Sequence, residues 1–116
     1  MNAVRDIFFF RRDFFDIYDQ QTPRIKRKID FILELIANME RVPAKFLKSI
    51  RDPDGLFEIR IRAGGDSFRF FCFFETNRRL IILNAFRKES QKTPRYEIER
   101  AEKLKREYFA AKKDRG

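Results

Sequence analysis

The chain has 116 residues, of which 27 are lysine or arginine and 18 are aspartate or glutamate, so its formal net charge is +9. It contains no histidine, which excludes histidine-dependent catalytic triads and most zinc sites, and its one cysteine cannot close an internal disulfide. The length predicts a single domain over residues 1–116. The basic excess predicts a partner rich in negative charge, nucleic acid first and an acidic protein second, although solubility alone stays open as an alternative.

The first predicted element is a strand at residues 7–11. Its apolar run, Ile7 to Phe10, is too short for a signal-peptide core or a membrane span, so we expect a cytoplasmic protein without membrane contact. The aromatic side chains predict a strand that is buried on both faces or pairs near the centre of the sheet.

Two helices are predicted next, at residues 13–20 and 23–38. The second begins at Thr22-Pro23, a capping residue followed by proline at the first helical position. Apolar residues recur at helical spacing on its inner face: Ile25, Ile29, Ile32, Leu33 and Ile36. Its charged residues, among them Lys28, fall mostly on the outer face, where we expect a helix surface rather than a binding site.

Residues 39–54 are expected to be a connector. A single turn at residues 44–50 could place its apolar residues against the core: Phe46, Leu47 and Ile50. The connector ends in Asp52-Pro53-Asp54-Gly55, which is typical of a tight turn.

Three strands are then predicted in hairpin succession, at residues 56–62, 67–75 and 79–86, with loops short enough to make neighbours antiparallel. Both faces of the middle strand are largely apolar, which predicts a central position, and Cys72 in this strand is expected to be a small buried residue.

A last helix is predicted from Thr93-Pro94, with an apolar stripe of Ile98, Ala101, Leu104 and Tyr108, followed by a mobile tail at residues 112–116. The predicted fold is α+β, with two N-terminal helices and a C-terminal helix packed on a mostly antiparallel sheet of about four strands.

Charged side chains on the first two hairpin strands predict a functional face. Glu58, Arg60 and Arg62 share one face of their strand, and Arg69 lies among aromatic residues of the next strand. Arg69 must reach solvent or an anion, because burying an unpaired arginine is costly. A salt bridge to Glu58 or Asp66 is the structural alternative.

A basic segment, FRKESQKTPR, follows at residues 86–95. If it leaves the sheet beside Arg60 and Arg69, the two regions would form one concave basic patch. Arginine side chains and a helix N-terminus both bind phosphate oxygens, so phosphate is the ligand that such a patch suits best.

The order of these pieces resembles the RelE/ParE superfamily of toxins from type II toxin–antitoxin modules, and in detail its HigB-like, phage-related branch. The match spans about residues 55–105, and the preceding helices agree in order and length. These residues fit the pattern of the branch: Gly55, Phe57, Glu58, Arg60, Arg69, Phe86, Arg87, Lys88, Gln91, Lys92, Thr93 and Pro94.

The resemblance implies a RelE-like fold and a cytoplasmic toxin that a cognate antitoxin holds inactive. The antitoxin of this branch is typically a HigA-like helix-turn-helix DNA binder. The freed toxin would bind the ribosome and cleave mRNA in the A site, as an endoribonuclease that needs no metal ion and no other cofactor. The substrate's 2′-hydroxyl would attack the adjacent phosphate and leave a cyclic phosphate and a free 5′-hydroxyl.

Roles for individual residues follow from this chemistry. The transition state gains negative charge, so preorganised cations are the main requirement, and Arg60, Arg69 and Lys88 are the candidates. Glu58 is the candidate general base, and the alternative is an ion pair that orients its arginine neighbours. Some family members have a histidine or tyrosine near the end of the last strand, and this chain has neither. The candidate RNA-binding residues are Arg62, Arg87, Gln91, Lys92 and Tyr96, of which Tyr96 could instead supply the acid or pack on the sheet.

Two other functions stay open. A ParE-like inhibitor of DNA gyrase would share the fold but would not need the RNA-cleaving cluster. A non-catalytic basic module would only bind nucleic acid or an acidic partner. The coincidence of cations on the strands and in the 87–92 loop favours the endoribonuclease.

Overall fold

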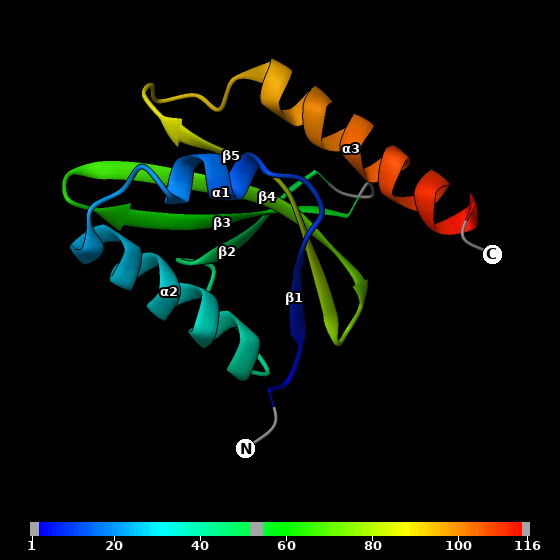
Figure 1. Cartoon of the computed structure of the whole chain (residues 1–116), viewed down its shortest axis with the longest axis horizontal. Coiled ribbons are helices and arrows are strands. Elements are labelled where there is room, and N and C mark those ends of the chain that lie inside the picture. Colours follow the sequence, from blue (N-terminus) through cyan, green and yellow to red (C-terminus); the bar gives the residue numbers. More distant parts are fainter. Residues whose placement is uncertain (1–2, 52–54, 115–116) are drawn as a thin grey trace.

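The computed structural model describes residues 3–51 and 55–114, which form a five-stranded mixed sheet and three helices (Figure 1). The strand order across the sheet is β1-β5-β4-β3-β2. The predicted α+β class is confirmed, but the sheet is larger than the predicted four strands, and β1 pairs with β5 in parallel. The elements follow in chain order: β1 (Asp6–Phe9), α1 (Asp13–Tyr18), α2 (Pro23–Asn38), β2 (Leu47–Arg51), β3 (Leu56–Ala63), β4 (Asp66–Thr76), β5 (Arg79–Lys88) and α3 (Arg95–Asp114).

The additional strand is β2, which lies where the sequence predicted a connector with a single turn. It pairs antiparallel with β3. Leu47 packs against the core beneath α2, whereas Ile50 contacts the core beneath α3. Because these two residues face opposite sides of the sheet, neither face shows a repeated apolar residue, and the segment lacks the period of two that reveals a strand. Residues 52–54 of the predicted turn lie outside the described residues.

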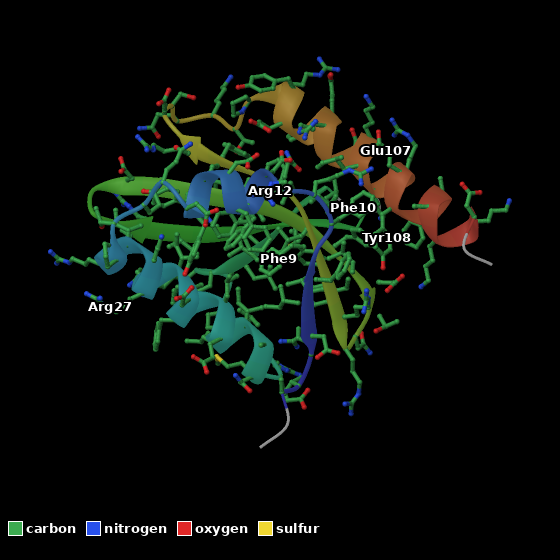
Figure 2. All side chains as sticks on the ribbon, viewed as in Figure 1. Phe9, Phe10, Arg12, Arg27, Glu107 and Tyr108 are labelled. Atoms are coloured by element: carbon green, nitrogen blue, oxygen red, sulfur yellow. The ribbon has the colours of Figure 1, made fainter. Side chains whose placement is uncertain are left out.

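β1 lies at an edge of the sheet, which corrects the prediction of a central or doubly buried strand. Helices on both sides of the chain account for its aromatic residues. The ring of Phe9 lies 4.5 Å from that of Phe14 in α1, and the ring of Phe10 lies 5.2 Å from that of Tyr108 in α3. Figure 2 shows Phe9 and Phe10 on these different sides.

The three strands from β3 to β5 are antiparallel neighbours, as the sequence predicted, and β4 is central in the sheet. Gly64 and Gly65 join β3 to β4 with φ angles of 61° and 84°, the left-handed conformation that a tight hairpin turn requires. Cys72 of β4 is fully buried, and burial raises the pKa of its thiol, so it acts as a core residue.

α1 and α2 pack on one face of the sheet (Figure 1). α2 spans the predicted residues, and the Oγ1 of Thr22 accepts a hydrogen bond of 3.4 Å from the Ile25 amide at its start. α1 ends at Tyr18, two residues before the predicted end. The core between α2 and the sheet is formed mainly by alternate strand residues and one helix face: Ile29, Ile32, Ile36, Ile59, Ile61, Phe68, Phe70 and Cys72.

α3 covers part of the opposite face, with Ala101, Leu104 and Tyr108 buried against β4 and β5. The helix continues to Asp114, so residues 112–114 of the predicted tail are helical, and residues 115–116 lie outside the described residues. No helix in the described part of the chain is long and apolar enough to cross a membrane.

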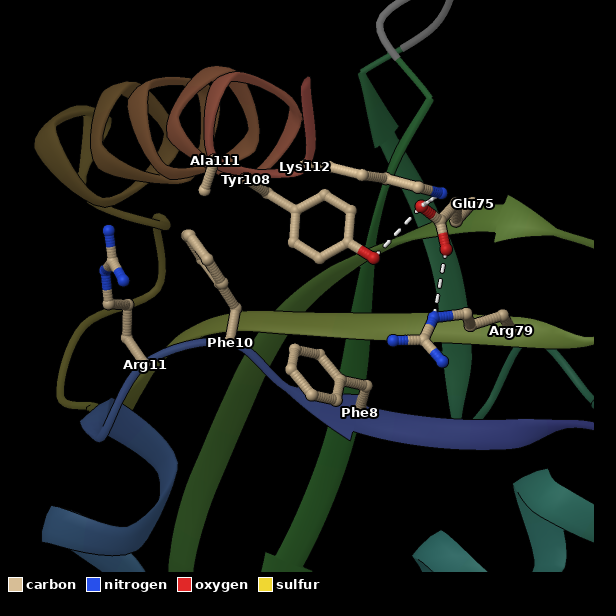
Figure 3. Close-up of a pocket in the computed structure, with 8 residues that line it drawn as sticks. All are labelled: Phe8, Phe10, Arg11, Glu75, Arg79, Tyr108, Ala111 and Lys112. Carbon is tan, nitrogen blue, oxygen red and sulfur yellow. Dashed lines mark hydrogen bonds and ion pairs between the residues drawn. The ribbon is translucent and has the colours of Figure 1, made fainter. Parts of the chain in front are cut away.

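A buried carboxylate joins the end of α3 to the sheet (Figure 3). The side chain of Glu75 in β4 is 6% exposed, and it pairs with Arg79 Nε at 2.9 Å. It also accepts hydrogen bonds from Lys112 Nζ and, at 3.0 Å, from Tyr108 Oη. The bond from Lys112 lowers the pKa of Glu75 most, the Tyr108 bond and the charge of Arg79 lower it further, and burial opposes them.

We expect the Glu75→Gln variant to lose about 1 to 3 kcal/mol of unfolding free energy at pH 7, because a charged acceptor of two hydrogen bonds is removed. The folded pKa of Glu75 lies below the ordinary value of 4.5, so its contribution is present above pH 4.5 and is lost as the pH falls through the folded pKa. Urea unfolding of both proteins should therefore differ less in acid than at pH 7. The exposed Glu34→Gln variant is the control, and a pH-independent difference for Glu75→Gln would contradict the prediction.

Candidate functional site

An extra residue in β5 determines which β5 side chains lie on the face of the sheet that α3 covers. Between two successive pairs of the register, β4 advances by two residues and β5 by three, which is a β-bulge. As a result, Leu83 and Phe86 both contact the core beneath α3. Lys88 then lies on the same face as Phe86, whereas Arg87 lies on the opposite face.

The bulge also anchors the start of α3. Asn84, inside the bulge, is fully buried, and its Nδ2 donates hydrogen bonds of 3.0 Å to both the carbonyl oxygen and Oε1 of Glu97. Glu97 lies in the first turn of α3. This contact fixes the point to which the loop of residues 89–94 must return after leaving β5.

Cations from three strands are brought together on this face. Arg60 in β3 lies directly opposite Arg69 in β4, and Ser67 lies between Arg62 in β3 and Lys88 in β5. With the following loop they line a hollow of about 510 Å³, whose lining residues are Arg60, Arg62, Ser67, Arg69, Lys88, Glu89, Ser90 and Gln91. The strands and the basic loop therefore form one concave patch, as the sequence predicted.

Glu58 lies beneath the arginines and does not line the hollow. Its side chain is 7% exposed, with Oε1 at 3.4 Å from Arg60 Nε and Oε2 at 3.8 Å from Arg69 Nε. The salt bridge that the sequence offered as an alternative for Arg69 is therefore present. Four cations face two carboxylates, Glu58 and Glu89, which leaves the patch positive.

Arg69 is held where the apolar cover of α3 ends. Its side chain is 7% exposed, and one terminal nitrogen donates a hydrogen bond of 3.1 Å to the Phe68 carbonyl. Burial lowers the pKa of Arg69, the charge of Glu58 opposes this effect, and Arg60 and Arg62 add to it. Phe71 and Phe86, with ring centres 5.2 Å apart, belong to the core beneath α3 and are paired with Glu58 and Arg69 in the sheet, so the charged cluster borders this core directly.

The structure divides the predicted RNA-binding residues. Arg62 and Gln91 line the hollow, whereas three others do not: Arg87, Lys92 and Tyr96. Arg87 is paired with Phe68, which belongs to the core beneath α2, and so it lies on the other face. Lys92 is exposed in the loop, and Tyr96 is 68% exposed in the first turn of α3.

Three residues of the hollow were missing from the predicted site: Ser67, Glu89 and Ser90. Ser67 lies two residues before Arg69 in the same strand, so the alternation of side chains contained a signal for it. No comparable periodic signal exists for the two loop residues, because their positions depend on how the loop returns to α3.

A separate hollow of about 530 Å³ lies between β1 and α3 (Figure 3). Its cations already have anionic partners: Arg79 and Lys112 contact Glu75 inside the hollow, and Arg11 lies 3.1 Å from Glu107 outside it. Three cations and two carboxylates leave a net charge of +1 here, against +2 for the hollow formed by β3, β4 and β5, so this hollow attracts an anion less. The hollow formed by β3, β4 and β5 is therefore the candidate functional site.

A comparison with protein families supports a relationship over most of the chain. The model described as phage derived protein Gp49-like (DUF891) matches residues 16–106. This range includes α2, the four strands from β2 to β5 and all residues of the candidate site. No match was found among curated proteins.

We expect Glu58→Gln to lower the free energy of unfolding by about 3 kcal/mol, because it leaves the buried Arg69 without a counter-charge. Urea denaturation measures the effect. Adding Arg69→Met should recover much of the loss, since an apolar side chain then replaces the unpaired cation. Glu89→Gln, in the exposed loop, is the control, and the hypothesis fails if Arg69→Met worsens the loss.

Proposed function

Because the chain belongs to the Gp49-like family of phage-derived proteins, which is part of the RelE/HigB-type toxin group, we propose that it is the toxin of a type II toxin–antitoxin module and a ribosome-dependent mRNA endoribonuclease of the HigB-like branch. The observation that carries the proposal is the convergence of Arg60, Arg69 and Lys88 on one hollow. A gyrase inhibitor of the same fold would not require this cluster.

In the proposed reaction, the ribose 2′-oxygen attacks the adjacent phosphorus, and the bond from phosphorus to the 5′-oxygen breaks. The products are a 2′,3′-cyclic phosphate and a 5′-hydroxyl, so the 2′-proton leaves and the departing oxygen gains a proton. Negative charge grows on the phosphoryl oxygens in the transition state, and fixed cations stabilise it. Arg60, Arg69 and Lys88 suit this role because their strands hold them in place before RNA binds.

Glu58 is better placed to position the arginines than to act as a base. It lies beneath Arg60 and Arg69, and it is nearly inaccessible from the hollow. A general base must come within hydrogen-bond reach of the 2′-hydroxyl, which Glu58 could do only if the arginines moved aside. The contacts therefore support a role in which Glu58 fixes the directions of the two guanidinium groups.

The family assignment also supports a cognate antitoxin as the partner of this protein. The net charge of +9 favours an antitoxin segment that carries acidic residues. We expect the antitoxin to be a HigA-like helix-turn-helix protein, and we expect the toxin to meet the ribosome and mRNA in the cytoplasm.

The central test is cleavage of mRNA in a purified bacterial translation system. Arg69→Ala and Lys88→Ala should each lower the initial cleavage rate by about 100-fold or more, because each removes a cation from the transition state. Arg87→Ala is the matched control, since this neighbour of Lys88 faces the other side of the sheet, and its rate should stay near that of the wild type. Primer extension locates and quantifies the cuts.

Two results would contradict the proposal. The first is intact mRNA together with inhibition of supercoiling by gyrase, which would indicate the gyrase poison instead. The second is an equal loss of cleavage in Lys88→Ala and Arg87→Ala, which would indicate that total charge matters and the hollow does not.

The role of Glu58 predicts a particular dependence of cleavage on pH. In Glu58→Gln the cleavage rate should fall by about 10- to 100-fold, because the arginines lose their common anchor, but the shape of the pH–rate profile should be kept. Cleavage is measured at a temperature at which the variant is folded, as judged by circular dichroism. If Glu58 is the general base, the variant loses the acidic limb of the profile.

A further inference from the structure

Another hollow, of about 270 Å³, adjoins the candidate site at the edge of the sheet, and it is distinct from the hollow between β1 and α3. It is called the second hollow below. Arg60, Arg62 and Arg69 line both hollows, which therefore meet along these three side chains. The other residues of the second hollow come from α2, from the chain before β2, and from β3: Lys28, Ile32, Lys45, Phe46 and Ile61. A ligand that contacts these three arginines in one hollow therefore lies at the entrance of the other hollow.

This opening exists because the pairing between β2 and β3 stops before the end of β3. β2 pairs with β3 only as far as Ile59, and the Arg60 amide then donates a hydrogen bond of 2.8 Å to the Phe46 carbonyl. Past Arg60, β3 continues to Ala63, and no strand among the described residues pairs with it on that edge. The space beside residues 60–63 is bounded by α2, at Lys28 and Ile32, and by the chain that leads into β2.

All charged residues that line the second hollow are cations. Five cations line it, three of them the shared arginines, and none of its lining residues is acidic. Lys28 and Lys45 are exposed, and neither forms an ion pair within residues 3–51 and 55–114. Lys45 Nζ lies 5.2 Å from the centre of the Phe46 ring, so the cation and an aromatic face are presented together.

Lys28 reaches this hollow because it borders the apolar face of α2. It precedes Ile32 by one helical turn, and both line the hollow. The sequence assigned Lys28 to the outer surface of the helix, since the helical pattern alone does not reveal that the edge of β3 lies beside it.

We propose that the second hollow binds the segment of single-stranded RNA that adjoins the scissile phosphate, so that the strand passes around the edge of β3 between the two hollows. This inference rests on the proposed function. Lys28 and Lys45 would neutralise phosphates, and the Phe46 ring would contact a base or ribose. Backbone-tracking cations beside an aromatic face are the combination that single-stranded nucleic acid binds.

An acidic protein segment is the competing occupant, and the arrangement favours RNA. The arginines shared by the two hollows place the cations of the second one in line with those of the first. RNA has a phosphate at every nucleotide and can therefore meet both sets of cations along one strand. An acidic peptide would need carboxylates that repeat over the same path.

The experiment measures binding of a fluorescent single-stranded RNA of about 10 nucleotides by anisotropy across a series of salt concentrations. The RNA is fully 2′-O-methylated, so it lacks the attacking hydroxyl and is not cut. Lys28→Ala and Lys45→Ala should each weaken binding and lower the slope of log affinity against log salt by about 0.7, the value for one phosphate contact on a single strand. The double variant should lose about twice that amount.

Arg27→Ala is the matched control, because Arg27 precedes Lys28 in α2 and extends away from the sheet in Figure 2. It should leave the salt slope unchanged. An unchanged slope in the double variant, or an equal decrease in Arg27→Ala, would overturn the inference. If the double variant loses affinity for a poly-glutamate peptide while RNA binding is kept, the occupant is an acidic partner and the RNA inference is wrong.

The same variants separate this inference from the proposed function. If the wild type cuts mRNA on ribosomes while the lysine variants keep the wild-type salt slope, the endoribonuclease stands and the second hollow does not bind RNA. If the wild type leaves mRNA intact while the salt slope of the lysine variants decreases as expected, RNA binding stands and the endoribonuclease fails.

Discussion

The β-bulge in β5 is the constraint on which both the core beneath α3 and the candidate site depend. One extra residue turns Leu83 and Phe86 to the same face, and Lys88 follows on that face. In an unbroken alternation from Leu83, Arg87 would have faced α3 instead, and Lys88 would have been on the side of α2. The bulge also directs the buried Asn84 side chain to the first turn of α3, so one local irregularity sets the position of the helix and of Lys88.

The arginine cluster shows how the protein holds like charges together at a site that is largely buried from solvent. Glu58 lies between Arg60 and Arg69 and offsets part of their repulsion, yet the group as a whole remains positive. Such an arrangement stabilises the fold little, because desolvation of buried ions cancels much of their attraction. The phenylalanine-rich cores on the two faces of the sheet supply the stability that the cluster does not. An anion that enters the hollow meets cations that are already in place.

Most of the regular structure could be predicted from the sequence because its signals are local. Thr22-Pro23 and the recurring isoleucines define α2, and alternation defines the three central strands and the common face of Glu58, Arg60 and Arg69. β2 could not be predicted, since its apolar residues face opposite sides. The bulge and the loop of residues 89–94 could not be predicted either, because they depend on contacts with α3. For this reason Arg87 was expected near the site, and Ser90 was not.

The anchoring of α3 at both ends has a consequence for the entropy of ligand binding. Asn84 fixes its first turn and Glu75 its last, while β5 fixes the other end of the loop of residues 89–94. A loop held between two fixed points samples fewer conformations than a free segment, for which ordering costs about 1 to 2 kcal/mol per residue. Much of that cost is met during folding, so Ser90 and Gln91 can engage a ligand with little further loss of freedom.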